Sequence, residues 1–140
     1  MQNGQNARPL LDETIAAARQ GLHGAPAQAR GWLILAEATA ARDGIDAPHV
    51  TDYLAESLRA SPYDVWMAPN RVWLALQLWD RLDAPTRVLA ATQIQLAIRN
   101  FGVERMVQMA RQLGAPEPVR QALMGDPELR RRFEALYLQL

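Results

Sequence analysis

Apolar residues recur at intervals of three and four along most of the chain, whereas strict alternation of apolar and polar residues is scarce. Proline or glycine interrupts the pattern roughly every 12 to 20 residues, as breakers between short elements do. The spacing of three and four is typical of amphipathic α-helices that bury one face. The sequence therefore predicts an all-α fold of about seven or eight helices and no convincing strand.

The expected helices begin and end at these breakers and at residues that cap helices. A flexible N-terminus is expected over residues 1–8, before the first periodic residues. Helices are then expected over residues 9–22, 26–42, 48–60, 64–82, 83–100, 103–113, 117–124 and 127–140. The fourth helix is expected to open with a single turn and a kink near Pro69, because proline lacks the amide that the helical ladder needs. Connections this short predict antiparallel neighbours.

The stretch at Arg59–Trp66, which reads RASPYDVW, contains the clearest stop signal. Pro62 disfavours helical geometry in the residue before it, so the preceding helix is expected to end there. Asp64 is placed to cap the next helix through its carboxylate. Asp83 and Asp126 each precede a proline and predict two further helix starts in the same way.

The helix around Trp73 carries more apolar residues than one face can hold. Val72 and Leu76 lie on one side of the helical wheel, whereas Leu74 and Leu78 lie on a second flank. Our preferred interpretation is a helix buried on two sides, as in the centre of stacked helical arrays. The alternative is a flank that contacts a partner, since exposed tryptophan and arginine are frequent interface hot spots. The contact residues would then be Trp66, Arg71 and Trp73.

The spacing from Trp32 to Pro62 resembles a tetratricopeptide repeat. The first helix of such a repeat carries an aromatic residue, a leucine three positions later, a small residue next and a bulky residue three further on; a proline closes the second helix. Trp32, Leu35 and Ala36 follow this spacing, with alanine in place of the usual glycine. Thr39 is a weaker substitute at the bulky position, and Pro62 stands at the closing position.

The resemblance covers roughly residues 9–80, which is about one and a half repeats, and is lost beyond Leu82. Pro26 lies where the closing proline of a preceding repeat would, so residues 10–26 resemble the second helix of that repeat. The whole chain is also similar to the C-terminal part of tetratricopeptide-type proteins of alphaproteobacteria. Such proteins have no settled activity, and some carry a membrane anchor upstream.

The resemblance implies a right-handed antiparallel α-solenoid over residues 9–82, closed by a helical capping segment over residues 83–140 in the same domain. Solenoids of this kind bind partners on the concave surface that their first helices line. The expected contacts there are Gln28, Arg30, Ile34 and Glu37. We therefore expect an adaptor or assembly scaffold whose partner is another protein or peptide, with a homodimer as a further expectation.

The amino-acid composition argues against several other classes of function. Lys and Arg together number 15, Asp and Glu also number 15, and the formal net charge is zero, which argues against a nucleic-acid or anionic-membrane partner. The run Arg130–Arg132 is expected to form a solvated face beside Glu128 and Glu134. Cysteine is absent, so disulfides and thiolate chemistry are excluded.

No motif for catalysis, a cofactor or a metal occurs in the sequence, and we expect none of the three. His23 and His49 are the two histidines, and neither has the spacing of a metal ligand. A small helical enzyme with acid and base residues from separate helices stays open as an alternative, as does a homo-oligomeric structural module. No segment reaches the roughly 18 apolar residues of a membrane span, so a soluble chain is expected. A cytoplasmic location is the default, and a periplasmic domain of an anchored protein is the alternative.

Overall fold

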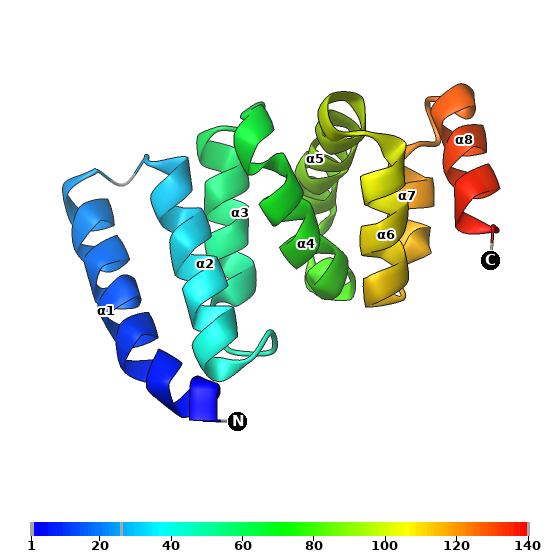
Figure 1. The fold of residues 1–140 in the computed structure, drawn as a ribbon. Helices are drawn as coiled ribbons and strands as arrows, with labels where there is room; N and C mark the ends of the chain where they lie inside the picture. The colour runs from blue at the N-terminus through cyan, green and yellow to red at the C-terminus, as the bar shows by residue number, and fades with distance from the viewer. Residues whose placement is uncertain (1, 26, 140) are drawn as a thin grey trace. The chain divides into compact units, whose positions relative to one another are not determined.

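The structure, a computed structural model, describes residues 2–25 and 27–139, and side chains from residue 7 onward within them. Every regular element in this part of the chain is helical, which confirms the predicted all-α class (Figure 1). The α-helices are α1 (Gln2–Gly24), α2 (Ala29–Asp43), α3 (Val50–Ala60), α4 (Ala68–Leu78), α5 (Ala84–Phe101), α6 (Val103–Leu113), α7 (Pro116–Ala122) and α8 (Pro127–Tyr137). Two short 3₁₀ helices flank α4, namely η1 (Val65–Met67) and η2 (Trp79–Arg81).

The chain divides into two compact units, Met1–Ser61 and Pro62–Leu140. The division falls at the predicted stop before Pro62, whereas the sequence placed the end of the repeat-like part at Leu82. The difference arises because α4 packs chiefly against α5 and therefore belongs with the C-terminal helices. The right-handed solenoid stays a prediction.

The N-terminal unit consists of α1, α2 and α3, with α2 packed against both neighbours in antiparallel order (Figure 1). Its core contains Ile15, Leu22 and Leu35, all nearly inaccessible to solvent. Gly31 permits the close approach of α1 to α2, because a Cβ atom there would lie 3.0 Å from Cδ2 of Leu22. Ser57 Oγ donates a hydrogen bond of 2.8 Å to the carbonyl of Ala29, which ties α3 to the first turn of α2.

The ends of three helices differ from the predictions. The start predicted at Pro9 is wrong, because α1 is helical from Gln2 and contains Pro9; the fixed φ of proline fits a helix, which loses one hydrogen bond there. Pro26 lies outside the described residues, and α2 begins at Ala29 after an N-cap at Gln28. The last helix ends at Tyr137, and the predicted end at residue 140 lies outside the described residues.

The C-terminal unit is organised around α5, which contacts α4, α6, α7 and η1. Both flanks of α4 are buried, Val72 and Leu76 on one side and Leu74 and Leu78 on the other, which confirms the two-sided helix. The predicted single turn before α4 is η1, and Pro69 follows in the first turn of α4. The tertiary structure therefore uses the surplus apolar residues of this helix inside the unit.

Three predicted aspartate caps are present in this unit. Asp64 Oδ1 accepts hydrogen bonds from the amides of Trp66 at 3.0 Å and Met67 at 3.3 Å. Asp83 and Asp126 each accept one bond in the same manner, at 2.9 Å and 3.1 Å. These carboxylates satisfy amide groups that the helix itself leaves without acceptors.

Candidate interaction groove

A groove of about 420 Å³ lies between the C-terminal half of α1 and the start of α2. The residues that line it are Thr14, Ala17, Ala18, Gly21, Leu22, Gln28, Arg30, Gly31 and Ile34. Arg30 is the single charged residue in this lining, and most of the other side chains are small or apolar. The groove therefore offers an apolar floor with one cation at its edge.

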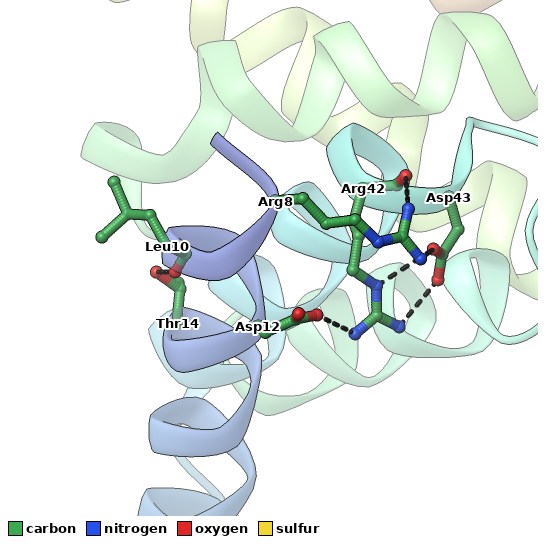
Figure 2. Close-up of polar contacts among 6 residues, drawn as sticks. All are labelled: Arg8, Leu10, Asp12, Thr14, Arg42 and Asp43. Carbon is green, nitrogen blue, oxygen red and sulfur yellow. Dashed lines mark hydrogen bonds and ion pairs between the residues drawn. The ribbon is translucent and has the colours of Figure 1, made fainter. Parts of the chain in front are cut away.

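The groove exists because small residues recur on the facing sides of the two helices. Thr14, Ala17 and Gly21 follow one another at three and four positions, so they lie on one face of α1. The hydroxyl of Thr14 donates a bond of 2.9 Å to the carbonyl of Leu10, which turns it toward its own helix (Figure 2). Side chains this short leave space that longer ones would fill, and Ile34 remains 38% exposed beside it.

A charged cluster joins the middle of α1, at Asp12, to the C-terminal end of α2. Arg42 Nη1 donates to Asp12 Oδ1 at 2.9 Å, and Arg42 Nη2 donates to Asp43 Oδ2 at 2.7 Å (Figure 2). Arg8 lies 3.6 Å from the other oxygen of Asp43. The hydrogen bonds from Arg42 hold the pKa of the Asp43 carboxyl below its ordinary value. The cluster links the two helices that form the groove.

One face of α2 carries two charged residues on either side of Ile34. Arg30, Ile34 and Glu37 are spaced by four and three positions and so lie on one stripe of the helix. Neither Arg30 nor Glu37 forms an ion pair with another residue that the structure describes. Glu37 is half-buried, and burial raises the pKa of its carboxyl. The stripe therefore presents a cation, an apolar side chain and an anion in that order.

The predicted contact residues do not form one site. Gln28, Arg30 and Ile34 line the groove together, and Glu37 lies on the same stripe outside the lining. Trp66 and Trp73 belong to the C-terminal unit, where they are 78% and 39% exposed.

The prediction that Arg71 contacts a partner is wrong, because its side chain is fully buried. Its Nη1 atom donates to Gln93 Oε1 at 3.2 Å, and Gln93 Nε2 donates to the carbonyl of Pro62 at 2.6 Å. Burial lowers the pKa of this guanidinium, and the nearby Asp64 opposes that effect. The residue therefore packs inside the C-terminal unit.

Sequence reasoning missed the α1 side of the groove, namely Thr14, Ala17, Ala18 and Gly21. Alanine is frequent throughout the chain, so the alanines of the first helix did not predict that this helix lines a groove. The available signal was the spacing of Thr14, Ala17 and Gly21 on one face. That spacing gains meaning only when the facing helix is known.

A second hollow of about 300 Å³ lies elsewhere on the N-terminal unit and is lined by Arg19, Leu22, His23, Trp32, Leu35 and Tyr53. The rings of Trp32 and Tyr53 stack there with centroids 6.1 Å apart. His49 lies at the start of α3, with Nδ1 3.4 Å from Asp52 Oδ2. Among the residues that the structure describes, neither histidine belongs to a group of three or more side chains that could hold a metal ion.

The C-terminal unit has an aromatic surface at Trp66 and a hollow lined by acidic residues. Trp66 packs edge-on against Phe101, and the guanidinium of Arg105 lies over the Phe101 ring at 5.6 Å. Asp80 and Glu117 line a hollow of about 260 Å³. Both carboxylates are exposed, and Glu117 is paired with Arg120 at 2.5 Å.

In the described part of the chain, no group of three or more histidine, aspartate or glutamate residues is placed to hold a metal ion. None of the described helices combines the length and the apolar character needed to cross a bilayer. All three residues of the run Arg130–Arg132 are exposed, as predicted for a solvated face.

Replacing Glu37 by glutamine is expected to change how stability depends on pH. Because the folded-state pKa of Glu37 is raised, the free energy of unfolding of the wild type falls as the pH rises from the ordinary glutamate pKa through the raised value. Glutamine cannot ionise, so the stability of Glu37→Gln relative to wild type should rise over that interval and then stay constant. Urea unfolding at a series of pH values measures this difference.

The matched control for that series is Glu13→Gln, which removes an exposed carboxylate from α1. It reports the general effect of removing one negative charge. A relative stability of Glu37→Gln that declines as the pH rises would contradict the role assigned to burial.

Comparison of the chain with protein-family models, with curated proteins and with solved structures finds no match.

Proposed function

We propose that this chain is a protein-interaction and assembly module that holds a segment of a polypeptide in the groove between α1 and α2. The observation that carries the proposal is the groove of about 420 Å³, with its apolar floor and with Gln28 and Arg30 at its edge. Binding sites for peptides and small ligands combine apolar surface with a few placed polar groups in this way. The apolar floor supplies affinity, and the polar edge orients the bound segment.

The packing around the groove supports a site that exists before its partner binds. Leu22 lies against Gly31 at one end of the helix pair, and Arg42 links the helices at the other end. The bond from Ser57 to Ala29 holds the first turn of α2 against α3. A site held in place loses less conformational entropy on binding, which favours affinity.

The packing of α2 also supports a role of the tetratricopeptide type. Leu35, Ala36 and Thr39 are buried, and Trp32 stacks on Tyr53 of α3. These residues occupy the positions that resemble the first helix of a repeat. The stacking of Trp32 on Tyr53 joins α2 to α3, which corresponds to the second helix of that repeat. The proposal therefore includes an adaptor built on a helix pair, with another protein or peptide as its partner.

Substitution of Ala17 by arginine is expected to abolish binding in the groove. Peptides are selected from a displayed random library against the wild-type chain, and their affinity is then measured by fluorescence anisotropy. Arginine at position 17 fills the floor of the groove and adds a charge, so affinity should fall at least tenfold. Ala16→Arg is the matched control, because Ala16 is also exposed on α1 but does not line the groove.

The control variant should bind as the wild type does. Selected peptides that bind both arginine variants equally would place binding elsewhere on the molecule and contradict the proposal. Circular dichroism of the two variants shows whether each retains its helices.

A further inference from the structure

The stripe of α2 formed by Arg30, Ile34 and the half-buried Glu37 is complementary to itself. Arg30 and Glu37 are separated by seven residues, or about 10.5 Å along a helix. An antiparallel second copy of the same stripe places its Glu37 opposite Arg30 and its Arg30 opposite Glu37. Both pairs form at once because the spacing is identical in the two copies, and the centre falls beside Ile34. Self-complementarity of this kind is what a two-fold interface requires.

From this arrangement we propose that the partner in the groove is a second copy of the chain, docked through α2 in antiparallel orientation. The inference rests on the proposed function and names the occupant of the same site. Ile34 of each copy enters the groove of the other, where Ala17, Ala18 and Gly31 leave room for it.

The charges of the stripe favour this occupant over an unrelated apolar segment. Among the residues that the structure describes, Arg30 and Glu37 have no ionic partner, whereas Arg42 and Arg59 are paired within the same unit. No acidic side chain lines the groove beside Arg30. Docking of the second copy supplies the missing anion to Arg30 and the missing cation to Glu37. Such pairs set register and orientation more than they set affinity.

The test is the solution mass of the chain, measured by size-exclusion chromatography with light scattering over a tenfold range of concentration. The wild type is expected at twice the mass of the chain. In the dimer, Arg30→Glu brings two negative charges together at both symmetry-related pairs, and Glu37→Arg brings two positive charges together there. Each variant should therefore raise the dimer dissociation constant at least tenfold. The double variant with both changes restores both pairs in reversed sense and should recover the dimer.

Arg19→Glu is the matched control, because it reverses an exposed arginine of α1 outside the groove lining and should leave the dimer intact. A wild type that is monomeric across the range overturns the inference. A dimer that survives both single reversals also overturns it, since its interface then lies elsewhere. So does a double variant that stays dissociated while retaining its helices.

Failure of this inference is separable from failure of the proposed function. If the wild type is a monomer and the selected peptides no longer bind Ala17→Arg, the groove remains a docking site, but for a different polypeptide. If the wild type is a monomer and the selected peptides bind Ala17→Arg as tightly as the wild type, both proposals are overturned.

Discussion

Replacing Phe133 by alanine is expected to destabilise the C-terminal unit by about 3–5 kcal/mol, the range for removal of a buried phenylalanine. Phe133 is fully buried and is the buried residue of α8. Its ring stacks on Tyr137 with centroids 5.6 Å apart. Equilibrium unfolding in guanidinium chloride measures the loss as a lower midpoint.

The loss should begin at α8 itself. An isolated helix of 11 residues is marginal in water, so α8 depends on its contacts with α6. Arg111 donates hydrogen bonds of 2.8 Å to the carbonyls of Leu136 and Tyr137, and Arg120 pairs with Glu134. The bonds from Arg111 and the partly buried pair of Arg120 and Glu134 do not replace the apolar area that the Phe133 ring removes from water. Hydrogen exchange should show loss of amide protection in α8 before α5.

The matched control is Leu138→Ala, which shortens an apolar side chain that is 70% exposed at the end of the same helix. It is expected to change stability by less than about 0.5 kcal/mol. Retained protection of α8 in Phe133→Ala would contradict the assignment of this ring as the anchor of the helix.

Replacing Arg71 by alanine is expected to cost about 3 kcal/mol of stability, because it leaves both a cavity and an unsatisfied partner. The side chain is fully buried, and its bond to Gln93 connects α4 and α5. Arg71→Met keeps most of the volume and removes the buried charge, so it should cost clearly less than alanine. Urea unfolding of the two variants side by side gives this difference.

The same pair of variants separates a packing role from a binding role. Peptide affinity and solution mass should be unchanged in Arg71→Met, since the guanidinium is enclosed within the C-terminal unit. Equal losses of stability in the two variants would show that the hydrogen bonds of the guanidinium, rather than its volume, dominate. A weaker association of folded Arg71→Met would contradict the structural role.

Local sequence determined most of the helices of this protein. Pro62 and the capping carboxylates of Asp64, Asp83 and Asp126 act within a few residues, so their effects can be predicted without knowing the fold. The periodicity of α6 and the surplus of apolar residues in α4 likewise follow from the order of residues alone. The start of α1 was the exception, because one proline does not decide whether a helix continues.

The tertiary structure decided which faces meet and which residues remain on the surface. Arg71 and Trp66 were equivalent candidates in the sequence, yet the packing of α4 on α5 buries one, and the other stays exposed. Ala17, Gly21 and Gly31 line the groove, and none of them carries a chemical signal of its own. Their role comes from the space that two helices leave between them. Such a space depends on residues distant in the sequence, which is why helix boundaries were predictable from the chain and the groove was not.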